Sequence, residues 1–113
     1  MHQGKEPTDW AEFFHALNGI VTGGTPTALA TVVESRGSTP QKSGAMMAVC
    51  ANGQTIGTVG GGCVEGKVKS ACLEALLRTG RPRLIEVSLT DEIGQADGDV
   101  CGGSMKILIE PLV

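Results

Sequence analysis

The fold of this chain is decided by residues 45–59, AMMAVCANGQTIGTV. Two apolar runs, at residues 45–50 and 55–59, flank Asn52-Gly53, a dipeptide typical of a two-residue β-hairpin turn. We therefore expect these two runs to form adjacent antiparallel strands. Because a hairpin pair is antiparallel, the sheet should be mixed or antiparallel, unlike the parallel sheet of a doubly wound nucleotide-binding domain.

Three further strands and two helices are expected around this hairpin. The strands cover residues 28–35, 83–88 and 105–110, the last closed by Pro111, and the second helix covers residues 63–79 before Gly80. The element order α-βββ-α-β-β predicts an α+β fold, with about five strands and two helices packed on the sheet. A length of 113 residues fits one domain, residues 1–113, with a flexible tail at 1–7 and no Rossmann-like second domain.

The first helix contains every aromatic residue of the chain. Trp10, Phe13, Phe14 and Leu17 follow the spacing of one helical face, after the capping residue Asp9. We expect this face to pack on the rest of the domain, and an aromatic surface for a partner is the alternative.

Composition excludes several classes of function. The net charge of −3 disfavours a surface that neutralises phosphates, and no aromatic side chain follows Phe14, so nucleic-acid binding is not expected. The longest apolar run, residues 45–51, is too short for the ~20 residues of a membrane span. The N-terminus lacks the apolar stretch of a secretory signal, which predicts a cytoplasmic protein with four reduced cysteines.

Glycine accounts for 17 of the 113 residues, and its distribution points to possible binding loops. Eight glycines lie within residues 37–66 and four within residues 94–103, and each stretch sets a cysteine directly against glycines. Glycines allow a backbone to approach a ligand closely, so these stretches are candidate halves of one ligand site.

The first candidate segment is the turn at Gly61-Gly62-Cys63, followed by Glu65. A strand runs into glycines and then opens a helix, whose first turn has unpaired N–H groups and a partial positive charge that suit an anion. The same field lowers the pKa of a thiol such as Cys63, although the charge of Glu65 opposes this. A tight turn without a ligand, with Cys63 as a small buried residue, is the alternative.

Two other loops offer complementary groups. Cys101-Gly102-Gly103 follows an acidic stretch whose side chains could accept hydrogen bonds or bind magnesium. The loop at residues 36–44 offers Arg36, Gly37, Ser38 and Lys42, and its two cations suit phosphate or carboxylate ligands. A solvated loop is the alternative in both cases.

The remaining two cysteines are expected to be structural. Cys72 falls on the apolar face of the second helix, and Cys50 ends a strand. The four cysteines include no C-x-x-C pair, which argues against zinc-ribbon and thioredoxin-like sites.

Three segments, in this order, resemble the N-terminal domain of the XdhC/CoxI family of xanthine dehydrogenase accessory proteins. They are residues 30–45 (ATVVESRGSTPQKSGA), 57–66 (GTVGGGCVEG) and 100–112 (VCGGSMKILIEPL), and the match covers roughly residues 10–112. The resemblance implies a protein that binds molybdenum cofactor (molybdopterin) and hands it to an apo-enzyme. In one branch of the family, a cysteine desulfurase replaces an oxo ligand on molybdenum with sulfur while the accessory protein holds the cofactor.

By position, the resemblance places cofactor-binding residues in all three loops. The matching residues are Gly37, Ser38 and Pro40 in the first loop, Gly61, Gly62, Cys63 and Glu65 in the second, and Cys101, Gly102 and Gly103 in the third. The thiolates of Cys63 and Cys101 suit a soft, sulfur-rich molybdenum centre. Gln41 and Met46 stand where the family often has basic residues, so the first loop is expected to bind phosphate less strongly.

The sequence therefore predicts a carrier of molybdenum cofactor rather than an enzyme. The partners that the resemblance implies are a molybdenum hydroxylase client, a cysteine desulfurase and a separate Rossmann-domain subunit, since larger family members continue into such a domain. Exposed sheet edges make a homodimer a further expectation. The alternatives are a persulfide sulfur-transfer protein and an assembly or regulatory module without a ligand.

Overall fold

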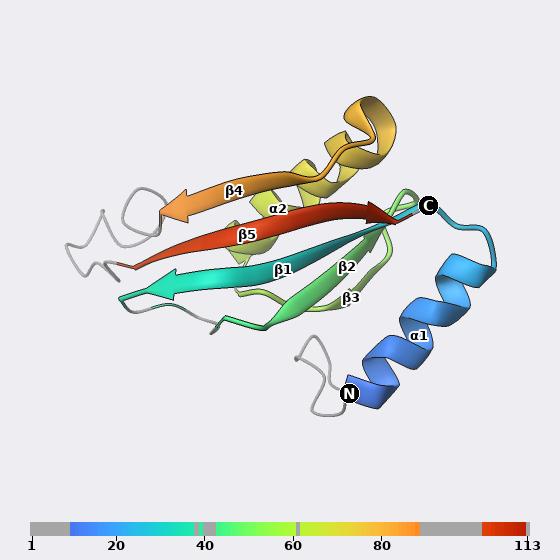
Figure 1. Cartoon of the computed structure of the whole chain (residues 1–113), viewed down its shortest axis with the longest axis horizontal. Coiled ribbons are helices and arrows are strands. Elements are labelled where there is room, and N and C mark those ends of the chain that lie inside the picture. The colour runs from blue at the N-terminus through green and yellow to red at the C-terminus, as the bar shows by residue number, and fades with distance from the viewer. Residues whose placement is uncertain (1–9, 38, 40–42, 61, 89–102, 113) are drawn as a thin grey trace.

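The computed structural model describes residues 10–37, 39, 43–60, 62–88 and 103–112, with the backbone alone at residues 62 and 63. Figure 1 shows a long twisted sheet with one helix behind it and another beside one corner. The elements are α1 (Trp10–Thr22), β1 (Thr27–Arg36), β2 (Met46–Cys50), β3 (Thr55–Gly57), α2 (Gly62–Glu74), a π-helical turn η1 (Ala75–Thr79), β4 (Arg83–Ser88) and β5 (Ser104–Leu112).

The five strands form one sheet in the order β3-β2-β1-β5-β4, and every neighbouring pair is antiparallel. The predicted hairpin joins β2 to β3, where Ala48 pairs with Ile56. Gly53 adopts a φ of 95° in the turn, a conformation that glycine adopts without strain. The predicted fold class and element order are therefore confirmed, and the sheet is antiparallel throughout.

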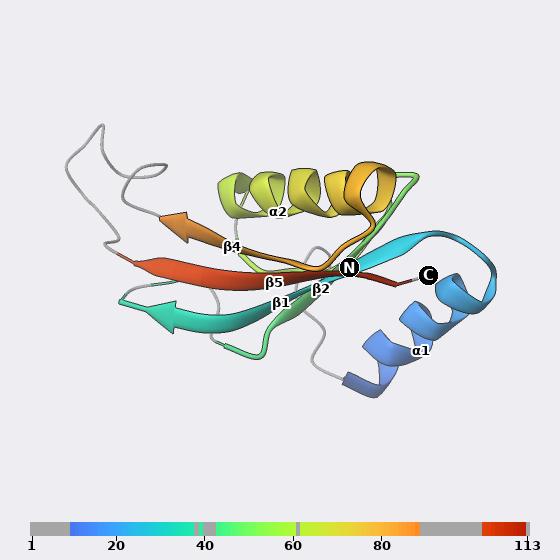
Figure 2. The same ribbon diagram turned by 45° about the horizontal axis from the view of Figure 1, so that its top comes forward.

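The two helices cover opposite faces of the sheet, as Figure 2 shows. Val64, Val68 and Cys72 of α2 are buried against the main core, which includes Val32 of β1 and Ile107 of β5. On the other face, Phe13 and Leu17 of α1 pack with Ala48 in a smaller cluster. Because α1 covers only one corner, much of that face over β1, β5 and β4 has no helix on it (Figure 1).

Glycine allows α1 to pack closely on the β2–β3 hairpin. Gly57 has a φ of 78°, and a Cβ atom there would lie 2.6 Å from the carbonyl oxygen of Met46 and 3.0 Å from the Phe13 ring. A side chain at position 57 would therefore displace either the hairpin or the helix.

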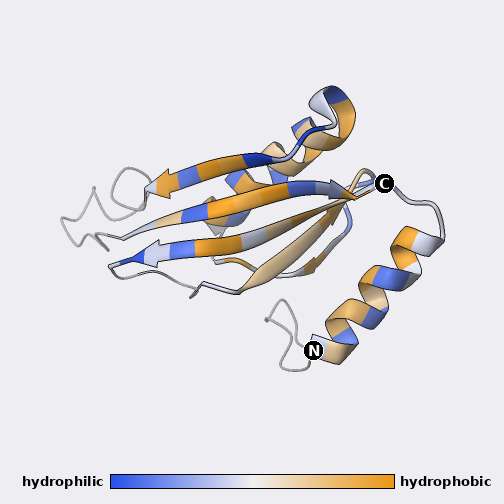
Figure 3. Ribbon diagram, in the orientation of Figure 1, coloured by the Kyte–Doolittle hydropathy of each residue, from blue (hydrophilic) through white to orange (hydrophobic). Residues whose placement is uncertain are grey.

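The aromatic face of α1 is only partly buried. Phe13 is 1% exposed, whereas Trp10 and Phe14 are 42% and 43% exposed and contact the Phe13 ring edge-on. The hydropathy colouring of Figure 3 shows apolar residues along α1 beside the sheet corner. Core packing is thus confirmed for Phe13 and Leu17 and is wrong for Trp10 and Phe14, because the sheet corner is wide enough to cover only one side of the helix.

Several element boundaries differ from the sequence-based expectation, and three of the differences have a clear physical reason. Pro111 lies inside β5 rather than closing it, since β4 pairs with β5 only as far as Ile109 and a proline is tolerated where a ladder is missing on one side. The third strand ends at Gly57, because its positive φ turns the chain away. The final turn of the second helix is π-helical and closes at Gly80, whose N–H donates to the Ala75 carbonyl at 2.8 Å.

The two cysteines assigned to the core are buried and free, as expected. Burial raises the pKa of the Cys72 thiol to about 12, so this thiol is neutral and unreactive at physiological pH. None of the helices in the described segments has the length and apolar character needed to cross a bilayer. The tail expected at residues 1–7 lies outside the described residues.

Candidate functional site

Two of the three candidate loops meet the sheet side by side. β1 ends at Arg36 and β5 begins at Ser104, and these two residues are register partners. Gly37 therefore leaves the sheet directly beside the point where Gly103 enters it. Figures 1 and 2 show that α2 also begins at this end of the molecule, on the far side of the sheet from α1.

The described candidate residues of the three segments thus lie toward one end of the sheet. Arg36 and Gly37 belong to the first segment, Gly62, Cys63 and Glu65 to the second, and Gly103 to the third. The backbones of Gly62 and Cys63 form the first turn of α2, a 13-residue helix. The other predicted site residues, Ser38, Lys42, Gly61, Cys101 and Gly102, lie outside the described residues.

Glu65 has a partner within the chain. Its carboxylate accepts a hydrogen bond from the hydroxyl of Thr58, which is buried in the turn before α2. The same hydroxyl accepts the N–H of Gly60 at 3.2 Å and lies 2.9 Å from the Gly60 carbonyl oxygen. This contact links the first turn of α2 to the chain just after β3. It therefore holds the backbone of residues 62 and 63 in a fixed position relative to the hairpin.

A row of charged side chains crosses the sheet at the same end. Glu34 of β1 is the register partner of Lys106 of β5, and Lys106 is the register partner of Glu86 of β4. The Glu34 carboxylate bonds to the Arg36 guanidinium, and its other oxygen lies 3.6 Å from the Lys106 ammonium. These contacts hold the pKa of Glu34 below its usual value, and the hydrogen bond from Arg36 has the largest effect.

The charged row lines a cavity of about 240 Å³. Its lining residues are Glu34, Arg36, Glu86, Ser104 and Lys106. Sequence reasoning found Arg36 and missed the other four, which come from three strands that only the register brings together. Of the five, only Glu86 lies outside the three segments that resemble the family, but the sequence singled out no residue except Arg36 as a candidate ligand.

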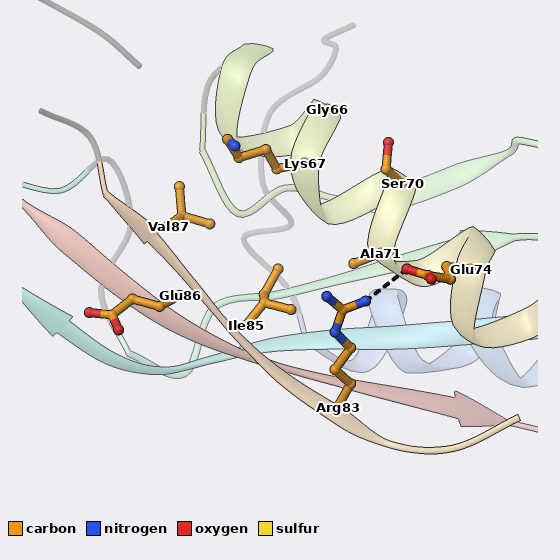
Figure 4. A pocket seen from close by; sticks show the side chains of 9 residues that line it. All are labelled: Gly66, Lys67, Ser70, Ala71, Glu74, Arg83, Ile85, Glu86 and Val87. Atoms are coloured by element: carbon orange, nitrogen blue, oxygen red, sulfur yellow. Dashed lines mark hydrogen bonds and ion pairs between the residues drawn. The ribbon is translucent and has the colours of Figure 1, made fainter. Parts of the chain in front are cut away.

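A second, larger groove of about 490 Å³ separates α2 from the edge strand β4. Figure 4 shows Ile85 and Val87 directed toward the helix and Glu86 directed away from it. An ion pair of 2.8 Å between Arg83 and Glu74 closes one end. Among the described residues of the segments singled out by the sequence, only Gly66 at the start of α2 lines this groove.

Metal-binding side chains do not gather anywhere among the described residues. No group of three or more His, Cys, Asp or Glu side chains among them could hold a metal ion. Within the part of the chain that the structure describes, the candidate site is the end of the sheet where Arg36 pairs with Ser104, because the first and third segments meet there.

Comparison with known proteins shows the family of this chain. The model of the XdhC and CoxI family matches residues 20–88, which is more than half of the chain. The chain belongs to the XdhC and CoxI family. The matched range includes β1, the start of the first loop and the glycine turn into α2, so two of the three candidate segments fall within it.

Individual relatives of this XdhC/CoxI domain support the same assignment. The protein YqeB of Escherichia coli K12 is 45% identical over 84 residues, which are 74% of this chain and 15% of YqeB. The crystal structure of a xanthine dehydrogenase from Bacillus halodurans superposes with a TM-score of 0.73 at 27% identity, over 88% of this chain and 30% of that one. The chain therefore spans less than a third of either relative.

Family membership implies, in general terms, an accessory role in the maturation of molybdenum hydroxylases. The resemblance noted from the three sequence segments is confirmed at the level of the family.

Proposed function

We propose that this chain binds molybdenum cofactor as cargo at the loop end of the sheet and delivers it to a molybdenum hydroxylase. The observation that carries the proposal is that the first and third segments meet the sheet side by side, at Arg36 and Ser104, while α2 begins toward the same end on the opposite face. The chain's membership of the XdhC and CoxI family supplies the class of cargo.

The residues at this end of the sheet fit an anionic pterin phosphate. The first turn of α2 offers backbone N–H groups and a partial positive charge to an anion. The Arg36 side chain is 74% exposed at the edge of the cavity and can donate to phosphate oxygens in pairs. Lys106 lines the same cavity, where its ammonium lies 3.6 Å from the Glu34 carboxylate.

Thiolates supply the soft ligands that a molybdenum–sulfur centre favours. Cys63 belongs to the first turn of α2, and a cysteine thiolate is the form that binds a soft metal. Cys101 stands two residues before Gly103 in the sequence. We assign both thiols to the metal end of the cargo, which the chain holds while a desulfurase partner acts on it and then releases to the client enzyme.

Uptake of molybdenum tests this proposal. The purified chain is mixed with molybdenum cofactor from a donor protein, separated by gel filtration and analysed for bound molybdenum by mass spectrometry. Cys63→Ala and Cys101→Ala should each retain less molybdenum than the wild type and should slow maturation of an apo-hydroxylase. Lys69→Ala, on the body of α2, is the control and should behave as the wild type.

Two results would contradict the assignment. Full molybdenum uptake and full client maturation in both cysteine variants would remove the thiols from the site. Wild-type protein that takes up no molybdenum but carries sulfane sulfur on a cysteine would favour the sulfur-transfer alternative.

A further inference from the structure

We propose that the cavity on the open sheet face is the subsite for the heterocycle of the cargo, where Glu86 accepts the N–H donors of a 2-amino-4-oxo pyrimidine ring. This inference rests on the proposed function and specifies which end of the cargo this face recognises. It is based on two carboxylates of the cavity: Glu34, which is paired with Arg36 and Lys106, and Glu86, which has no such partner among the described residues.

The cavity lies on the sheet face opposite α2, away from the corner of that face that α1 covers. Ile85 and Val87 of β4 face α2, so Glu86 between them points to the opposite side, as Figure 4 shows. Met105 and Ile107 of β5 likewise belong to the α2 core, which places Lys106 on the open face. The row from Glu34 through Lys106 to Glu86 therefore presents its charges to solvent in one line.

A β-bulge brings Glu34 into this row. The register of β1 on β5 shifts by one residue between Val32 and Glu34, so Val32 faces α2 while Glu34 pairs with Lys106 on the open face. Without the shift, Glu34 would follow Ala30 and Val32 onto the buried face.

The two carboxylates of the row differ in their partners. Glu34 is engaged by both Arg36 and Lys106. Glu86 forms no hydrogen bond or ion pair with any described residue and interacts with Arg36 only through space. Its two oxygens are therefore available to two adjacent N–H donors, and the Lys106 ammonium and Ser104 hydroxyl beside it can donate to a carbonyl.

A 2-amino-4-oxo pyrimidine ring presents the complementary pattern. One edge of this ring, as in a pterin or a guanine, carries an amino group, a ring N–H and a carbonyl in sequence. The cavity volume of about 240 Å³ is below the ~300–1,000 Å³ of sites that enclose a whole ligand, so it suits the ring and leaves the rest of the cargo outside.

Fluorescence titration with two free heterocycles tests this subsite. The probes are pterin, which has the 2-amino group, and lumazine, which has a carbonyl in its place and so turns an acceptor toward Glu86. Wild-type protein should bind pterin at least about tenfold more tightly than lumazine, because a charge-assisted hydrogen bond is lost and two acceptors then oppose each other. Glu86→Gln should lose this preference, since an amide can donate to the lumazine carbonyl.

Glu110→Gln is the matched control, because Glu110 lies on β5 further from the loop end and outside the cavity. It should keep the wild-type preference for pterin. Absence of pterin binding, equal binding of both probes by the wild type, or an unchanged preference in Glu86→Gln would overturn the inference. Molybdenum uptake measured in parallel separates the two claims: uptake without a Glu86-dependent preference rejects the subsite alone, and a preference without uptake rejects the delivery of molybdenum alone.

Discussion

At the scale of single residues, Thr58 shapes the entrance to α2. Its hydroxyl donates to the Glu65 carboxylate and accepts the Gly60 N–H, so one side chain joins the end of the hairpin to the first turns of the helix. The two residues are seven positions apart and belong to different elements, a spacing that matches no local capping motif. The contact could not be predicted from the sequence, which pointed to Glu65 only as a candidate ligand.

Removing the Thr58 hydroxyl should loosen this entrance. Thr58→Val leaves the carboxylate without its donor and should lower the free energy of unfolding by about 1.5–3 kcal/mol, the range for hydrogen bonds to charged groups. Urea denaturation measures the change, with Thr55→Val on exposed β3 as the control. Equal stability of the two variants would show that the Thr58–Glu65 contact contributes nothing.

At the scale of elements, the β2–β3 hairpin and α1 depend on each other through Gly57. The Asn52-Gly53 turn made the hairpin predictable, since that dipeptide favours a tight antiparallel connection. The need for glycine at position 57 was not predictable, because it arises from the Phe13 ring and the Met46 carbonyl, which approach from other elements.

Alanine at position 57 should therefore be costly. Gly57→Ala sets a Cβ 2.6 Å from the Met46 carbonyl oxygen at a φ of 78° and should destabilise the protein by about 2–4 kcal/mol in urea. Gly66→Ala is the comparison, since nothing lies within 4 Å of its Cβ position in α2, and it should stabilise by about 0.5–1 kcal/mol. If both alanines had the same effect, the close packing of α1 on the hairpin would be disproved.

At the scale of the whole molecule, the antiparallel topology gathers distant segments at one end of the sheet. These segments could be identified from the sequence, because two of them set a cysteine beside glycines and all three resemble the family in the same order along the chain. The charged row was not predictable. Strand alternation places Glu34 on the buried face, and only the bulge at Val33 turns it toward Lys106 and Glu86.

The central claim is that this end of the sheet holds molybdenum cofactor, and co-purification tests it most directly. The chain is purified from cells grown with abundant molybdate, and bound molybdenum and pterin are both quantified per chain. Wild-type protein should carry the two in equal amounts. Arg36→Ala should carry at least about tenfold less, from loss of a charge-assisted contact, while Arg81→Ala near the start of β4 should match the wild type. Wild-type protein without molybdenum and pterin, or Arg36→Ala with a full complement of both, would contradict the account.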